Sequence, residues 1–213
     1  MGIKERKERE QERRRQQIIV AAKRVFTKKN FNQARMEDIA NEAEVSPGTI
    51  YLYFKNKDEL FVSLSLRILQ FLCITVEHVE SEEGADALVK LDKLIEAMYD
   101  GYDFDPRNFI HIFHLKSNDI LKNLSPKMVI EIKKMLNKSM KSIAGIFKEG
   151  IEKGVIVDRH PVVLAEIFWS LFSGIVLWES NRKIFNGNKD DLKQTIGIAF
   201  EIFQKGIITG EGS

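Results

Sequence analysis

Hydrophobic residues recur at helical spacing along almost the whole chain, and almost no segment alternates with a period of two. Pro47, Pro106 and Pro126 each follow a Ser or an Asp, whereas Pro161 follows a histidine. Ser and Asp cap helix N-termini, and proline suits the first helical position because its missing N–H is not needed there. The pattern therefore predicts an all-α chain whose prolines open helices.

We expect about nine helices, over residues 12–29, 36–43, 47–53, 57–80, 84–101, 106–122, 126–153, 161–182 and 189–208. The first three are short and close together, and the others are long. We therefore expect a small N-terminal domain over residues 1–56 and a larger helical domain over residues 57–213. The helix that starts at Lys57 joins the two.

The segment from Met36 to Lys57 predicts a short helix, a three-residue turn and a second short helix. Met36, Ile39, Ala40 and Ala43 fall on one helical face, and the two alanines are small enough for a close helix–helix approach. Ser46 is the expected cap of the second helix. Two helices joined so tightly indicate a helix-turn-helix, whose second helix enters the DNA major groove.

The order of residues from about Arg15 to Leu60 resembles the tetracycline-repressor (TetR) family of transcriptional regulators. The alternative is that these residues only pack a helical hairpin in some other protein. This alternative is less favoured, because many positions match in the same order. The positions that carry the resemblance are Ile19, Ala22, Phe26, Phe31, Ile39, Ala40, Ala43, Val45, Ser46, Gly48, Thr49, Tyr51, Tyr53, Phe54, Lys57 and Leu60.

The resemblance implies that the second short helix and its neighbours contact double-stranded DNA. Thr49 suits a base edge, and hydroxyl and ammonium groups suit phosphate oxygens. Ile50 and Phe54 are expected in the core, and Leu52 is open to either role. The expected DNA-binding residues are Arg35, Pro47, Gly48, Thr49, Tyr51, Tyr53 and Lys57.

The chain departs from the family pattern at several positions. Arg35 stands where a Ser or Thr usually caps the first short helix, and Glu37 stands where bases are often read. Glu44 replaces the glycine commonly found between the two helices. If that position is left-handed, the substitution costs about 1 kcal/mol.

Charge is concentrated at the N-terminus. Residues 1–29 contain eleven Lys or Arg and four Glu, a net charge of +7, which leaves the remainder at −5 against a chain total of +2. A basic segment beside a helix-turn-helix is the expected footprint for phosphates, although a solvated charged helix has the same composition. Arg13, Arg14 and Arg15 are the better candidates for DNA contact.

Residues 161–178 are apolar on all sides, with Glu166 as the only charge. Such a run could be a membrane-spanning helix, but a span needs about 20 apolar residues and no neighbouring span is present. We therefore expect no membrane partner. The alternative is a helix that packs on its own subunit and on a second one. The resemblance implies a homodimer through a four-helix interface built from helices 161–182 and 189–208.

The larger domain is rich in aromatic side chains, and the resemblance implies that it houses a receptor for a small hydrophobic effector. The composition favours an apolar or aromatic ligand such as a fatty-acyl compound. His111 and His114 have metal-compatible spacing, but no third ligand is evident, so we expect no metal and no cofactor. The expected lining residues are Met98, Tyr102, Phe109, Phe113, Phe147 and Phe172.

No catalytic motif is present, and the single cysteine, Cys73, lies in an apolar run. The basic N-terminus lacks the apolar stretch of a signal peptide, so we expect a cytoplasmic protein. The sequence thus predicts a repressor that binds a palindromic operator and is released by a small apolar ligand. An interaction protein whose helix-turn-helix no longer binds DNA is the alternative.

Overall fold

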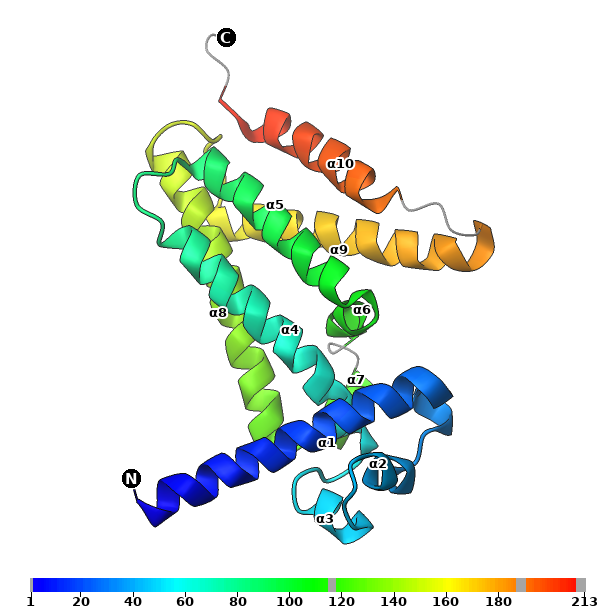
Figure 1. Cartoon of the computed structure of the whole chain (residues 1–213). Coiled ribbons are helices and arrows are strands. Elements are labelled where there is room, and N and C mark those ends of the chain that lie inside the picture. The colour runs from blue at the N-terminus through cyan, green and yellow to red at the C-terminus, as the bar shows by residue number, and fades with distance from the viewer. Residues whose placement is uncertain (1, 115–117, 187–190, 210–213) are drawn as a thin grey trace. The chain divides into compact units, whose positions relative to one another are not determined.

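A computed structural model describes residues 2–114, 118–186 and 191–209 of the chain, except for the side chains of residues 3, 30, 111, 114, 118–120, 181 and 183–186. The described residues form ten helices and no strand, which confirms the all-α prediction (Figure 1). An isolated antiparallel bridge joins Ile156 and Ile208. The helices are α1 (Ile3–Gln33), α2 (Met36–Glu42), α3 (Pro47–Tyr51), α4 (Lys57–Glu80), α5 (Ala87–Phe104), α6 (Pro106–His114), α7 (Asn118–Asn123), α8 (Pro126–Glu152), α9 (Pro161–Asn186) and α10 (Leu192–Ile207).

Two of the expected helices differ clearly from the structure, whereas the ends of the others agree to within four residues. Helix α1 begins at Ile3 instead of near residue 12, because the basic N-terminal segment consists of Glu, Lys, Arg and Gln, which are strong helix formers. Its side chains also bond along the helix, as Gln16 does to Glu12. The single helix expected over residues 106–122 corresponds to α6 and α7, and the residues between these two lie outside the described part of the chain.

The chain divides into two compact units. The first unit is Met1–Arg67 with His114–Glu131, and the second unit is Ile68–Phe113 with Ile132–Ser213. Helices α4 and α8 each have residues in both units. Helix α7 thus belongs with the N-terminal helices, although it is more than 60 residues away from α3 in sequence. The functional boundary expected after residue 56 stays a prediction.

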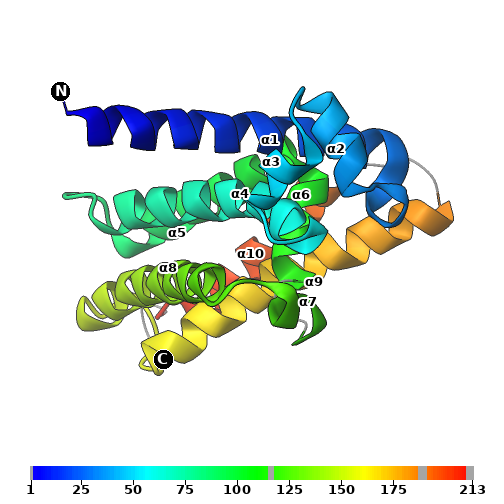
Figure 2. The same cartoon turned by 90° about the horizontal axis from the view of Figure 1, so that it is seen from below.

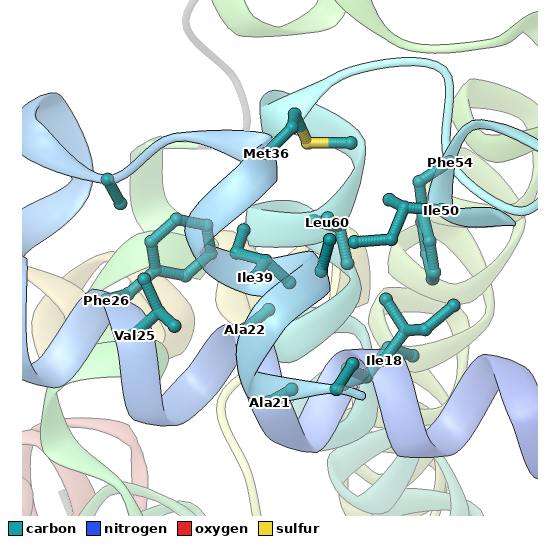
Figure 3. Packing of buried hydrophobic residues seen from close by; sticks show 14 of the residues in the cluster. Ile18, Ala21, Ala22, Val25, Phe26, Met36, Ile39, Ile50, Phe54 and Leu60 are labelled. Atoms are coloured by element: carbon teal, nitrogen blue, oxygen red, sulfur yellow. The ribbon is translucent and has the colours of Figure 1, made fainter. Parts of the chain in front are cut away.

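Among the described residues of the first unit, a hydrophobic core joins α1, α2, α3 and the start of α4 (Figure 3). Ile18 and Ala22 of α1, Ile39 of α2 and Ile50 of α3 are fully buried in it. At about 25 cal/mol per Å² of apolar surface, each such side chain contributes on the order of 1–3 kcal/mol. This core fixes α3 from behind and leaves its other face to solvent.

In the second unit α10 packs on α9 and α5 (Figure 2). Close approach is possible where α8 carries Gly150: a Cβ there would lie 3.0 Å from the Cβ of Ala87. Two backbone hydrogen bonds join the end of α10 to the segment between α8 and α9. The Val157 N–H donates to Ile207 O at 2.8 Å, and the Thr209 N–H donates to Val155 O at 3.2 Å.

Two of the described helices are long and apolar enough to cross a membrane, judged by length and composition alone. In Lys57–Glu80, 67% of the apolar window is buried inside the chain, as in the core helix of a folded domain. In Pro161–Ser180 only 28% is buried. Helix α9 therefore presents an apolar surface that the described part of the chain does not cover.

Candidate functional site

The turn between α2 and α3 has the hydrogen bonds of a Schellman motif. The Glu44 N–H donates to Asn41 O at 3.2 Å, and the Val45 N–H donates to Ala40 O at 3.0 Å. Glu44 occupies the left-handed position with φ of 54°, the only positive φ among the described residues other than glycine. The conformation expected for this position is therefore present, and Glu44 bears its strain.

Ser46 caps α3 as expected. Its Oγ accepts the Thr49 N–H at 3.1 Å and lies 2.8 Å from Thr49 Oγ1, so the two hydroxyls also form a hydrogen bond. Pro47 follows at the first helical position. The side chain of Thr49 is thus held in one orientation before any DNA binds.

Helix α3 has one buried and one exposed face. Ile50 and Phe54 are buried, as expected, whereas Tyr51 is 52% exposed and Leu52 is 82% exposed. Gly48 is exposed too, and a Cβ built there would meet only Ser46 Oγ, at 3.8 Å. Tyr53 is half-buried and packs against the core of the first unit. The exposed face is narrow and carries hydroxyl, apolar and backbone groups suited to a major groove.

Lys57 makes contacts that the sequence did not reveal. Its Nζ donates to Phe31 O at 2.7 Å and to Ala34 O at 3.0 Å, and it lies 4.4 Å from the centre of the Phe31 ring. The ammonium group therefore ties the start of α4 to the connection between α1 and α2. One of its three N–H groups is left for the phosphate contact, which stays a prediction.

Arg35 precedes α2, and its side chain is exposed and makes no capping hydrogen bond. Instead the Arg35 N–H donates to Asp38 Oδ2 at 3.0 Å, and Lys29 Nζ lies 2.7 Å from Asp38 Oδ1. The hydrogen bonds from Lys29 and then from the Arg35 N–H hold the pKa of Asp38 below its ordinary value of 3.8. The Arg35 guanidinium remains available for a phosphate.

The three arginines of the basic segment have different surroundings. Arg13 is exposed, and Arg14 Nη1 donates to Gln17 Oε1 at 3.1 Å. Arg15 lies over the Phe54 ring, 5.1 Å from its centre. Arg15 therefore helps to pack the first unit, and the contact of Arg13 or Arg14 with DNA stays a prediction.

The residues expected to line a ligand site fall into two aromatic groups of the second unit. Phe109 lies at the centre of one group, with ring centres 5.9 Å from Tyr102, 5.6 Å from Phe113 and 5.9 Å from Phe172. Phe113 in turn contacts Trp169 at 5.9 Å, a neighbour that the expected lining did not include. We call these five residues the Phe109 group.

Phe147 belongs to the second aromatic group, with Phe168 at 6.0 Å and Phe203 at 6.2 Å. It is therefore not part of the Phe109 group. Met98 is buried in the second unit. The side chains of His111 and His114 lie outside the described residues. Whether any of these residues contacts a ligand stays a prediction.

Comparison with known proteins gives consistent matches over the N-terminal helices and over most of the chain. The model of the family described as bacterial regulatory proteins, tetR family, matches residues 18–64. The fatty acid metabolism regulator protein of Bacillus subtilis (strain 168) is 30% identical over 196 residues, which cover 90% of this chain and 94% of that protein.

Solved structures show the same fold. The crystal structure of the transcriptional regulator FadR from Bacillus subtilis in complex with stearoyl-CoA matches with a TM-score of 0.66 and 26% identity, over 90% of this chain and 98% of that one. A regulator of the TetR/AcrR family from Thermobifida fusca matches with a TM-score of 0.70 and 19% identity, over 91% and 97% of the two chains.

These relatives are transcriptional regulators. This finding favours a DNA-binding regulator over an interaction protein whose helix-turn-helix no longer binds DNA. The resemblance inferred from the sequence is confirmed, as is the N-terminal helix-turn-helix with a helical body behind it. The chain belongs to the TetR family of transcriptional regulators.

Proposed function

We propose that this protein represses transcription by binding a palindromic operator as a homodimer, and that a long-chain acyl-CoA releases it. The exposed face of α3, carried on a fully buried core, is the observation that supports DNA reading. Among the proposed contact residues, Gly48 and Tyr51 are exposed and Thr49 is half-buried on α3, and Arg35 is exposed before α2.

The effector class is supported by the relatives. The B. subtilis protein that is 30% identical over nearly all of this chain is named a fatty acid metabolism regulator, and FadR was crystallised with stearoyl-CoA. In this chain the Phe109 group supplies an apolar surface of the kind that an acyl chain requires. Phe113 and Trp169 are only half-buried, so they are the proposed entrance to the site.

The homodimer is supported by the uncovered faces of α9 and α10. Ile167 is 46% exposed and Trp178 is 70% exposed on α9, and Ile198 and Ile202 of α10 are 51% and 66% exposed. Large exposed apolar side chains gathered on two helices are typical of a protein interface. A second copy of the chain would cover both faces, and two-fold protein symmetry would then be mirrored in the operator.

Titration of acyl-CoA into the protein–operator complex tests this proposal. The DNA upstream of the protein's own gene is the probe, and binding is followed by fluorescence anisotropy. Stearoyl-CoA should weaken operator binding by about 5–150-fold, the usual range of coupling between two sites. Free CoA is the matched control and should leave binding unchanged, because it lacks the acyl chain. Equal binding with and without stearoyl-CoA would rule out acyl-CoA as the effector.

The cytoplasmic location and the absence of a membrane partner stay predictions. Both agree with a role in DNA binding, and the relatives named above are bacterial regulators.

A further inference from the structure

The turn after the reading helix α3 is hydrogen-bonded to the turn between α7 and α8. Asn56 Nδ2 donates to Asn123 O at 2.7 Å, and Asn123 Nδ2 donates to Asp58 Oδ2 at 3.0 Å. The two turns are therefore joined in both directions. Their residues are 65 or more positions apart in the chain, and all lie in the first unit.

Glu59 adds a third connection from within the protein. This side chain is buried, and its Oε1 accepts the Ser125 N–H at 2.8 Å while its Oε2 accepts the Lys55 N–H at 2.7 Å. One carboxylate thus holds the backbone of both turns. Removing it would leave two N–H groups without their acceptor, which is more costly than the loss of an exposed contact.

Asn56 performs two tasks with one side chain. Its Oδ1 accepts the Glu59 N–H at 2.9 Å and so caps α4, while its amide nitrogen holds Asn123. The two tasks can be separated by substitution. Serine at this position retains a capping oxygen but has no amide that reaches Asn123.

We infer that Asn123 and Ser125 are positioning residues of the DNA-reading surface, which act through Asn56, Asp58 and Glu59 to fix the turn that follows α3. We call these five residues the latch. The latch connects the residues just before α8 to the turn after α3. Since α8 continues into the second unit, this connection is separate from the one that α4 makes along the chain. This inference rests on the proposed DNA reading by α3, but its first measurement needs no DNA.

The first measurement is amide hydrogen exchange of the free protein, followed by mass spectrometry of peptides covering residues 52–60. Asn123→Ala should speed exchange in these peptides by about 3–10-fold, because a lost hydrogen bond makes local opening easier. Glu131→Gln is the matched control. Glu131 is exposed near the start of α8 and takes no part in the latch, so exchange in residues 52–60 should stay at the wild-type rate.

The second measurement is operator affinity by fluorescence anisotropy at a temperature where each variant is folded. Asn123→Ala and Asn56→Ser should each weaken operator binding by about 3–10-fold, while Glu131→Gln should bind at least as tightly as the wild type does. Asn56→Ser keeps the α4 cap and tests the latch from its other side, should Asn123→Ala fold poorly.

Unchanged exchange in residues 52–60 would overturn the latch, and so would unchanged operator affinity in both variants. Weaker operator binding with normal exchange would show that Asn123 contacts DNA directly, which also contradicts a positioning role. If the wild-type protein binds no operator, the proposed function fails, whereas the exchange experiment still decides whether the latch holds the turn.

Discussion

Replacement of Gly48 by alanine should have opposite effects on two properties: it should stabilise the fold and weaken binding to the operator. A Cβ at this position meets only Ser46 Oγ, at the ordinary contact distance of 3.8 Å, and the φ of Gly48 is not positive. The methyl group is therefore accommodated without strain. Because alanine restricts the unfolded chain more than glycine does, the free energy of unfolding should rise by about 0.4–1 kcal/mol.

On the DNA side the same methyl group stands on the exposed face of α3, where the backbone is expected to approach the bases closely. Glycine permits such an approach because it has no Cβ. Gly48→Ala should therefore weaken operator binding at least tenfold, about 1.4 kcal/mol in binding free energy. Affinity for non-specific DNA should change much less, since phosphates supply most of it.

Chemical denaturation gives the stability of the variant, and fluorescence anisotropy gives its affinity for operator and for non-specific duplex. Glu44→Gly is the control, because it relieves the left-handed strain at φ of 54° and should also stabilise the protein, by about 1 kcal/mol. Its operator affinity should be equal or higher, since a carboxylate is lost. A Gly48→Ala variant that is more stable yet binds operator as tightly as the wild type would refute close approach at Gly48.

Four further predictions follow from the same structure. Thr49→Val keeps the shape of the side chain but removes its hydroxyl, so operator selection should show a changed preference at one base pair, by roughly 1–3 kcal/mol. Lys57→Met removes two hydrogen bonds from a charged donor and should lower the free energy of unfolding by about 1–3 kcal/mol in denaturation. The salt slope of operator binding should also fall by about 1, and an unchanged slope would show that Lys57 holds no phosphate. Ile202→Glu places a charge on the exposed face of α10, so light scattering should find a folded monomer, and an intact dimer would contradict this interface. The pKa of Asp38 is lowered in the folded state, so its contribution to stability is complete above 3.8 and is lost as the pH falls further. As the pH is lowered below 3.8, the melting temperature of the wild type should therefore fall more steeply than that of Asp38→Asn. An equal fall in both proteins would contradict the lowered pKa of Asp38.

The structure changes the choice of variant for the dimer. Phe200 of α10 is an unsuitable target, because it is 1% exposed and its ring lies 4.8 Å from that of Phe168. A charge at Phe200 would unfold the second unit instead of separating two subunits. Ile202 lies two residues further on and faces solvent, so it reports on association alone.

The sequence by itself determined the helical class, the family and the helix-turn-helix. The helix-turn-helix depends on local spacing, with Ser46 before Pro47 and apolar Ile50 and Phe54 a few residues later. The left-handed position at Glu44 was an expectation from the family resemblance alone, because glycine is common there. A cap or a turn is decided by the side chains next to it, so such features can be predicted before any tertiary contact is known.

Only the tertiary structure decided which distant groups meet. Lys57 appeared to be a free charge, yet two carbonyl groups 23 and 26 residues earlier accept its hydrogen bonds. The expected ligand-lining residues looked like one set, but Phe147 belongs to a different aromatic group from Phe109. Asn56 and Asn123 show no sequence pattern that pairs them, because periodicity records which face of a helix is apolar and not which other helix covers it.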